Sequence, residues 1–521
     1  MHKKLFHIIL ILTVVSIKVI GQVDIKGQVV DNNNNPLINA SINWINTNKG
    51  TITDENGFFL ISTQNITNTQ LVISFIGFQN DTISTSEILP ENFKTKLYPL
   101  TNLQSVDLID NKKNTYIDNE KTIKTEIITQ KELTKAACCD LAGCFETQIS
   151  VEPKTTNIIT NTKELSVLGL SGSYNHILID GIPIVNGANY TYGTSAIPGT
   201  LIKNIHISQG LASVLQGPES ITGQINILLK EQSQEKIFLN LYLNSFLSKQ
   251  INFDYNFNIG SWKSILSIHS TQPAKEIDHN DDNFLDLPKT TKYSMYNKWT
   301  YDSKSNNRLF SSITLRYLQE QRIGGEIDFN IEEKGSDSIY GQIISFKQPE
   351  IHFKGSYQLN DKNHIILLSG TSLHHQESYF GTTKYIADQI TNLSDISYLH
   401  KWEGHQTTTG LSIKQLQLNE NILLNNDFNL SYGGDYLKNE IVSGIFLENT
   451  FKWNKNIELI TGLRFDYHNE HGSFTTPRAL LKYDITENCI TRISLGKGWK
   501  IKNIFTEHVY LFGSNKDIII A

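Results

Sequence analysis

The sequence predicts a mainly β protein built from an N-terminal β-sandwich, a small α/β domain and an incomplete antiparallel transmembrane β-barrel. Three observations support this fold class. Residues 22–99 contain short alternating strands with regular turn signals. Residues 164–230 contain short apolar strands interrupted by glycines. From Glu235 onward, apolar and polar residues alternate with a period of two, as in strands with one lipid-facing and one polar face.

The N-terminal residues 1–21 have the pattern of a secretory signal peptide. His2, Lys3 and Lys4 precede the apolar run 5–17, and the small residue Gly21 lies at a plausible cleavage point. The run is shorter than the ~20 residues that a membrane-spanning helix needs. We therefore expect the mature chain outside the cytoplasm.

The overall charge argues against a nucleic-acid partner. The chain has 46 Lys and Arg against 52 Asp and Glu, for a formal net charge of -6. Such a balance offers no basic surface for a polyanion. We predict no nucleic acid among the partners.

Residues 22–99 are predicted to form the β-sandwich. Asp54 and Glu55 could serve as metal ligands, but Asp54-Glu55-Asn56-Gly57 is better explained as a hairpin turn, with Gly57 in the left-handed conformation. The phrases G-T-x-T-D-x-x-G-x-F at 50–59 and I-S-x-I-G-F at 73–78 resemble the carboxypeptidase-regulatory-like domain.

Residues 117–232 contain two linked phrases, NHILIDGIPI at 175–184 and IPGTLIKNIHISQGLASVLQGPESITGQINI at 197–227. Their order resembles the plug domain of TonB-dependent outer-membrane receptors. The chain has Leu168 where family plugs often carry an arginine that helps tie the plug to the barrel wall. The matching positions are Leu178, Ile179, Asp180, Gly181, Pro183, Gly210, Ser213, Gly217, Gly223, Ile225 and Asn226.

Residues 100–116 are polar and are predicted to be a linker between the sandwich and the plug. The resemblance implies a TonB box near this position, which would add as an edge strand to the TonB energy-transducing complex of the inner membrane. A plain linker is an equally good interpretation. The best candidate for the box is Gln104, Ser105, Val106, Asp107, Leu108 and Ile109.

A glycine- and tyrosine-rich loop, residues 185–196, separates the two plug phrases. The resemblance implies that this loop faces the extracellular side and contacts a small ligand. Asn189, Tyr190 and Tyr192 are the candidate ligand-binding residues, since tyrosines offer rigid amphipathic surface. The alternative is ordinary packing against the barrel wall.

Three cysteines at the start of the plug form a possible metal site. Cys138, Cys139 and Cys144 have a spacing that could hold Cu(I) or another thiophilic metal. The alternatives are a disulfide from Cys144 to one of the other two, or plain buried thiols. Cys489 is the fourth cysteine of the chain.

Residues 233–521 are predicted to form the barrel, with lipid outside and a polar lumen. In the strand at 251–259, Phe253 and Tyr255 alternate with Asp254 and Asn256. Gly260-Ser261 is predicted to be a tight turn. The polar stretches 272–290 and 324–340 are predicted to be long extracellular connections.

The first long connection contains a candidate calcium loop. Asp278, Asn280, Asp282 and Asp286 have the 1, 3, 5 and 9 spacing of such a loop. However, Asn283 and Lys289 replace the usual glycine and bidentate glutamate. A solvated acidic loop is the alternative interpretation.

The later strands carry charges that would project into the lumen. Buried lumenal charges need partners, so we interpret them as groups that lock the plug rather than as catalysts. They are Glu448, Arg464, Asp466, Arg478 and Arg492.

The barrel region has room for roughly 13 to 15 strands, whereas plugged transporters of this kind close with about 22. The chain also ends in IIIA rather than in an aromatic residue. We therefore expect a truncated or split coding sequence.

No hydrolase, zinc-protease or phosphate-loop motif occurs, so we predict that the protein is not an enzyme and requires no cofactor. Calcium and a thiophilic metal are the candidate ions. The resemblance implies a receptor surrounded by outer-membrane lipid. It would import a scarce ligand, such as a metal chelate, siderophore or cobalamin-like compound, by energy-coupled plug displacement. The alternatives are a surface adhesion or glycan-docking protein and a nonfunctional truncated receptor.

Overall fold

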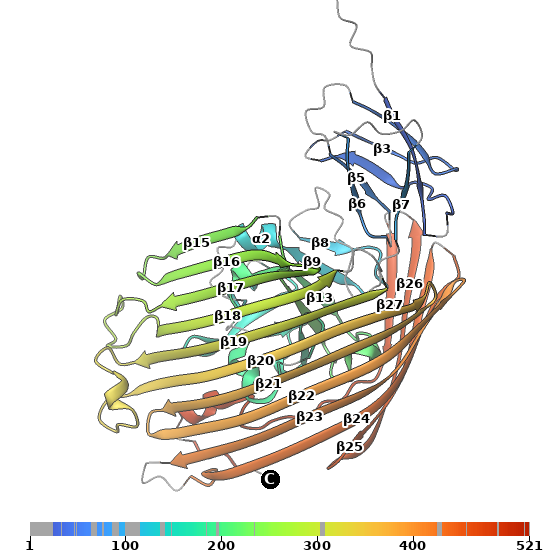
Figure 1. Ribbon diagram of the computed structural model, residues 1–521. Helices are drawn as coiled ribbons and strands as arrows, with labels where there is room; N and C mark the ends of the chain where they lie inside the picture. Colours follow the sequence, from blue (N-terminus) through green and yellow to red (C-terminus); the bar gives the residue numbers. More distant parts are fainter. Residues whose placement is uncertain are drawn as a thin grey trace, which may run out of the picture. The chain divides into compact units, whose positions relative to one another are not determined.

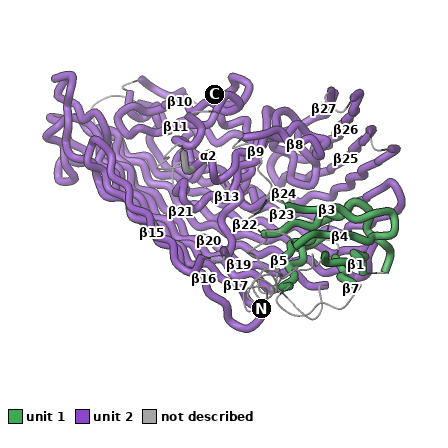
Figure 2. Tube along the Cα trace, turned by 90° about the horizontal axis from the view of Figure 1, so that it is seen from above, with its two compact units in different colours: residues 1–109 green, residues 110–521 purple. Residues whose placement is uncertain are grey.

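The computed structural model describes residues 24–519, except for 33, 46, 48, 64–69, 76–77, 86–92, 99–114, 136–140, 147, 184, 194–196, 234, 303–307, 425–429, 455, 487–488 and 515. The chain divides into two compact units, residues 1–109 and 110–521 (Figure 2). Within the described ranges, no helix has both the length and the apolar character needed to cross a membrane.

The first unit is a β-sandwich, as predicted. One sheet has the order β4-β1-β7 and the other β3-β2-β5-β6, and both contribute to one buried core that includes Trp44, Phe59 and Leu71. The Asp54 carboxylate accepts hydrogen bonds from the backbone N–H groups of Asn56 and Phe58, both at 2.9 Å, so it caps the predicted turn. The strands are β1 Asp24–Val30, β2 Ser41–Trp44, β3 Gly50–Ile52, β4 Phe58–Ser62, β5 Gln70–Ser74, β6 Asp81–Ser84 and β7 Phe93–Lys96.

The second unit contains the plug, a name we use for residues 115–232. Its five-stranded sheet has the order β12-β14-β13-β9-β8, in which β12 and β14 are parallel and the other pairs are antiparallel. A separate hairpin joins β10 and β11. The strands are β8 Thr115–Asp118, β9 Thr125–Thr129, β10 Val151–Asn157, β11 Thr162–Val167, β12 Asn175–Ile179, β13 Ile202–Gln209 and β14 Gly223–Leu229.

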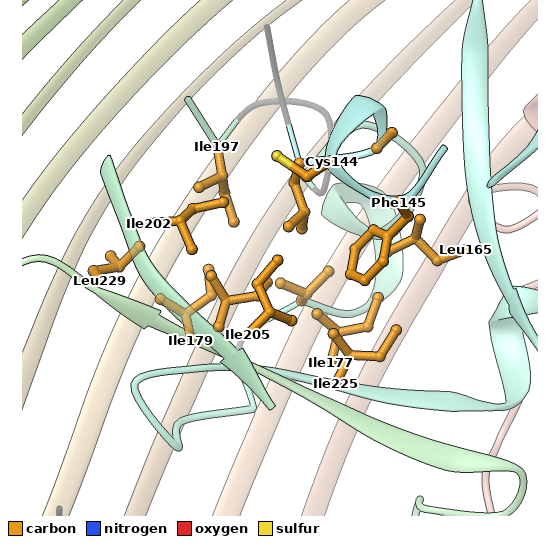
Figure 3. Close-up of a cluster of buried hydrophobic side chains, with 14 of the residues drawn as sticks. Cys144, Phe145, Leu165, Ile177, Ile179, Ile197, Ile202, Ile205, Ile225 and Leu229 are labelled. Atoms are coloured by element: carbon orange, nitrogen blue, oxygen red, sulfur yellow. The ribbon is translucent and has the colours of Figure 1, made fainter. Parts of the chain in front are cut away.

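Short helices join the plug strands and complete its core. Phe145 packs with Leu165, Ile177, Ile205 and Ile225 in a buried cluster (Figure 3). Burial of such large apolar side chains explains how so small a sheet holds its shape. The helices are α2 Gln130–Lys135, η1 Gly143–Phe145, η2 Gly172–Tyr174, η3 Gly187–Asn189, α3 Tyr190–Gly193, η4 Gly199–Leu201 and η5 Val214–Gln216.

The rest of the second unit is a sheet of 13 described strands, which we call the wall. Each strand pairs antiparallel with the next in chain order, and β15 and β27 lie at its two edges, so the described sheet is not closed (Figure 1). The strands are β15 Ile237–Leu243, β16 Lys249–Ile259, β17 Trp262–Gln272, β18 Lys289–Asp302, β19 Leu309–Gly325, β20 Gly341–Asn360, β21 Asn363–Phe380, β22 Thr383–Trp402, β23 His405–Leu424, β24 Gly434–Lys452, β25 Ile457–His468, β26 Gly472–Thr486 and β27 Cys489–Gly496.

The predicted alternation of wall residues is confirmed. In β16, Asn252, Asp254 and Asn256 are buried toward the plug, whereas Phe253 and Tyr255 are half-buried on the other face. An apolar outer face and a polar inner face are what a lipid-embedded sheet around a polar lumen requires. The wall therefore presents its hydrogen-bonding side chains to the plug.

The predicted connections between wall strands are also confirmed. Gly260-Ser261 joins β16 to β17 directly, and Gly260 has a φ of 60° that suits glycine. The segments 273–288 and 326–340 are the long connections that precede β18 and β20. Alternation of short and long connections is typical of outer-membrane barrels.

After β27 the chain turns back toward the inner face of the wall. A short helix, η7 (Val509–Gly513), places Phe512 against the rings of Phe380, Tyr385 and Tyr432, with centroids 5.7, 5.2 and 5.7 Å away. Residues 497–513, which we call the cover segment, thus pack against the inner face of the wall and against the plug.

Candidate plug–wall interface

The Leu178-Ile179-Asp180-Gly181 phrase builds the first contact between plug and wall. The buried strand β12 ends in a turn in which Asp180 and Gly181 have φ values of 51° and 81°. The Asp180 carboxylate accepts a hydrogen bond from the N–H of Leu229 at 3.0 Å and pairs with the Lys298 ammonium at 3.3 Å. The turn therefore points an acidic group at β18.

Two lysines keep Asp180 ionised. Burial acts to raise the pKa of its carboxyl, but the positive charges of Lys298 and Lys354 outweigh burial and lower the pKa. Lys298 also binds Glu231 at 3.0 Å, and Lys230 reaches Asp254 of β16 at 2.8 Å. A network of ion pairs thus surrounds the end of β14.

Arg478 and Glu448 contact the plug at η5 and at the residues that flank it. The Arg478 guanidinium donates to the carbonyls of Ala212, Ser213 and Pro218 at 2.8, 3.1 and 2.9 Å. The Glu448 carboxylate accepts from the hydroxyl of Ser213 at 2.6 Å and from the N–H of Val214 at 3.1 Å. The sequence-based prediction that these two residues lock the plug is confirmed.

Arg492 also confirms that prediction, at the turn that follows β8. It donates to the carbonyls of Asp118 and Lys121 at 3.2 Å each. Arg464 and Asp466, by contrast, bind each other at 2.8 Å within the wall. Both side chains lie on the inner face of the wall, as predicted, and Arg464 lines a cavity together with plug residues, but within the described residues neither makes a hydrogen bond to the plug.

Several further contacts were missed by sequence reasoning. Arg322 donates to the carbonyls of Thr160 and Asn161 at 3.1 and 3.2 Å, and the Gln389 side chain accepts from the N–H of Ala188 at 2.7 Å. Both side chains stand at strand positions that point inward, and this was the one sign in the sequence that they face the plug. Their partners could not be read from the sequence because register across the wall decides them.

A cavity of about 60 Å³, lined by both apolar and charged side chains, lies between the plug, the wall and the cover segment. On its plug side, His176 and Glu219 approach to 3.8 Å, and Glu219 is also bound by Lys414 of β23. Trp499 and Lys500 of the cover segment line the other side. A cavity of this size has room for a few ordered waters beside its charged side chains.

At neutral pH one of the two acid–base groups of the cavity is neutral and the other is negatively charged. Burial lowers the pKa of His176 to about 4, which leaves the imidazole neutral. Burial acts to raise the pKa of Glu219, but the charge of Lys414 and its hydrogen bond to the carboxylate outweigh burial and lower the pKa to about 2. Neither nitrogen of His176 has a hydrogen-bond partner within the described chain.

The candidate ligand residues Asn189, Tyr190 and Tyr192 are buried in η3 and α3, not displayed on an open loop. Tyr192 stacks on Phe346 of β20 with ring centroids 5.8 Å apart. The Lys500 ammonium lies 5.3 Å from the Tyr190 ring. The packing alternative therefore describes these residues in this structure, and ligand contact stays a prediction.

The cysteine cluster is only partly described. Cys144 is buried and disulfide-bonded, and Cys489 is an exposed free thiol. Cys138 and Cys139 lie outside the described residues. Because a disulfide sulfur is not a thiolate ligand, a thiophilic-metal site at Cys144 would require reduction. The metal interpretation stays a prediction.

The candidate calcium loop uses its acidic groups within the loop itself. Asp278 accepts from the N–H groups of Asp282 and Asn283 at 3.3 and 2.8 Å, and Asp282 accepts from Asn280 at 2.9 Å. Asp286 binds His279. Within the described ranges, no three His, Cys, Asp or Glu residues gather into a possible metal site.

Two further predictions lie outside the described residues. They are the signal peptide at residues 1–21 and the candidate TonB box, Gln104, Ser105, Val106, Asp107, Leu108 and Ile109.

Three segments of the chain match known families. Residues 25–106 match the CarboxypepD_reg-like domain, residues 118–224 match the TonB-dependent receptor plug domain, and residues 240–515 match the TonB dependent receptor-like β-barrel. The last match covers more than half of the chain. The chain belongs to the TonB-dependent receptor family. Its place is accordingly the outer membrane.

Relatives of the receptor differ in cargo. The vitamin B12 transporter BtuB of Vibrio cholerae is 20% identical over 406 residues, which cover 75% of this chain and 61% of that protein. The alcaligin receptor FauA of Bordetella pertussis shares the fold with a TM-score of 0.58 at 14% identity, covering 75% of this chain and 67% of that one. The copper transporter OprC gives 0.57 at 14% identity, with 74% and 64% covered. The receptor thus spans less than two thirds of the length of the curated relatives it matches.

Proposed function

We propose that this receptor takes part in energy-coupled import of a scarce ligand across the outer membrane. The proposed cargo classes are a metal chelate or siderophore and a cobalamin-like compound. The observation that carries the proposal is the plug itself, which occupies the inner side of the wall and is held there by ion pairs and hydrogen bonds. Polar contacts of this kind can be exchanged without opening either apolar core.

The proposed partner is the TonB complex of the inner membrane. Residues 104–109 would add to it as an extended strand, because β-augmentation uses backbone groups and needs little side-chain specificity. The chain then leads directly into β8, the edge strand of the plug sheet. A pull on the linker would reach β8 first.

The proposed ligand contacts are Asn189, Tyr190 and Tyr192. Thr191, between the two tyrosines, donates to the carbonyl of Thr506 at 2.7 Å. Ligand access would therefore require the cover segment to move away from α3.

Deletion of residues 104–109 tests the proposal. Radiolabelled cargo should still bind to cells that produce the variant, while energy-dependent uptake is lost. Deletion of the five residues 110–114, which lie between the candidate box and β8, tests whether shortening alone matters. Unchanged uptake after deletion of 104–109 would contradict coupling through this segment.

A further inference from the structure

Two rows of polar side chains cross the outer face of the wall near the long connections. The members of each row lie opposite one another on neighbouring strands. The first row is Tyr293, Gln319, Lys347, His375 and Asp388, and the second is Thr291, Gln321, Ser345 and Glu377. The next row toward the short turns, which we call the apolar row, contains the exposed side chains of Met295, Tyr317, Leu373 and Ile390.

The change from the apolar row to the polar rows marks where the hydrocarbon of the membrane ends. A lysine on the lipid-facing side of a barrel is strongly unfavourable at the middle of the bilayer and nearly neutral at its interfaces. Lys347 therefore lies at the level of the lipid head groups, at the predicted extracellular end of the wall. Toward the short turns, the exposed rings of Trp402 and Trp453 suit the other interface.

A groove of about 460 Å³ follows the two polar rows. This volume lies within the range of small-molecule sites, about 300–1,000 Å³. The Tyr293 side chain, which is 46% exposed, offers an aromatic ring to an occupant. The amides of Gln319 and Gln321 and the hydroxyl of Ser345 can both donate and accept hydrogen bonds. Such a lining suits a molecule with several hydroxyl groups.

The groove also contains a cation without an anionic partner. The other charged groups are paired, His375 with Asp388 at 2.6 Å and Lys384 with Glu377 at 2.9 Å. Lys347 lies opposite His375 on the neighbouring strand, and no carboxylate among the described residues pairs with its ammonium. A phosphate group would supply the missing negative charge.

We propose that this groove binds the head group of a phosphorylated glycolipid in the outward leaflet of the membrane. The Lys347 ammonium contacts the phosphate, and the Tyr293 ring and the Gln321 amide contact the sugar. The acyl chains continue over the apolar row, a contact that a soluble sugar phosphate would lack. The site is on the face of the wall opposite the plug, so the inference is independent of the import function.

Binding of defined lipids to the purified full-length protein, measured by native mass spectrometry, tests the inference. The three probes are lipid A, which is a glucosamine disaccharide with two phosphates, its dephosphorylated form, and phosphatidylglycerol. Loss of the phosphate should weaken binding about tenfold, because it removes a hydrogen bond between charged groups. Phosphatidylglycerol should also bind more weakly than lipid A, since it has no sugar ring.

Substitution of Lys347 locates the phosphate contact. Lys347→Gln should weaken lipid A binding about tenfold and leave binding of the dephosphorylated form unchanged, whereas Lys347→Arg should retain lipid A binding. Lys362→Gln is the matched control, since residue 362 lies in the short turn between β20 and β21, at the other end of the same two strands. Neither position faces the plug, so plug contacts stay in place.

Three results would overturn the inference. The first is equal binding of lipid A and its dephosphorylated form, or unchanged binding of lipid A by Lys347→Gln. The second is equal binding of phosphatidylglycerol, which would leave no role for the sugar. The third is a dimer that persists in the presence of lipid A and is lost in Lys347→Gln, which would assign the groove to a second copy of this chain.

Discussion

Arg478 holds the segment of the plug around η5 against the wall. Its guanidinium donates to three plug carbonyls, and Arg478→Gln would leave at least two of them without a donor. Hydrogen bonds to charged groups contribute about 1.5–3 kcal/mol each, so we expect the plug to lose about 2–4 kcal/mol of stability. Hydrogen exchange of the β14 amides in the purified protein measures this loss. Lys347→Gln, at an exposed position of β20, is the control, and equal exchange in both variants would refute the role of Arg478.

His176 gives the plug a pH dependence. Its pKa is about 4 in the folded plug against 6.5 for the free side chain, because burial disfavours the imidazolium. The unfolded chain therefore binds a proton in this range that the folded plug does not. Plug stability should fall as pH drops from about 6.5 towards 4, by up to about 3 kcal/mol.

Urea titrations of the plug at pH 7 and pH 5 test this dependence. In the native protein the midpoint should drop between the two values, and in His176→Gln the drop should be smaller. Glu219 does not interfere, since its pKa of about 2 keeps it ionised at both values. The same drop in the variant would exclude His176 as the source.

For single residues, the sequence identified some of the charged side chains that point inward from the wall strands. Glu448, Arg478 and Arg492 were predicted as plug contacts, whereas Lys298 and Lys414 were not. The sequence of a strand shows which side chains point inward. It does not show which plug residue each of them meets, because that depends on strand register and on the position of the plug.

Among the plug strands, β8 is the one that a force on the preceding linker would reach first. It pairs only with β9 at the edge of the plug sheet, and Arg492 of β27 holds the turn that follows it through carbonyls at 118 and 121. In Arg492→Gln we expect the β8 and β9 amides to exchange hydrogen several-fold faster, while β12 and β14 are unaffected. If amide exchange became equally faster in all strands of the plug sheet, Arg492 would not be stabilising β8 and β9 in particular.

Alternation and turn chemistry predicted the wall strands and the Gly260-Ser261 turn well. The segment 187–193 was predicted to be a loop, but it forms η3 and α3. Its glycines and tyrosines favour a loop in isolation. Packing of Tyr192 against Phe346 and of Thr191 against the cover segment decides otherwise, and no local signal carries that information.

For the whole molecule, the outer face of the wall must remain apolar. Ile351 lies on that face and is 48% exposed. Ile351→Arg should cost about 2–4 kcal/mol in the membrane and reduce the amount of folded protein in the outer-membrane fraction. Ile351→Leu is the matched control. Normal recovery of the arginine variant would mean that this face does not contact lipid.

The location of the plug inside the wall, and its movement during import, can be tested by one cross-link. In a Cys489→Ser background, Val214→Cys of the plug and Gly462→Cys of β25 place two Cβ atoms 3.4 Å apart, which is within reach of a disulfide. In intact outer membranes we expect oxidation to join the two cysteines and to block uptake of the cargo, and we expect a reductant to restore uptake. Two cysteines that react separately with thiol reagents but do not join, or a joined pair that still permits uptake, would contradict the account.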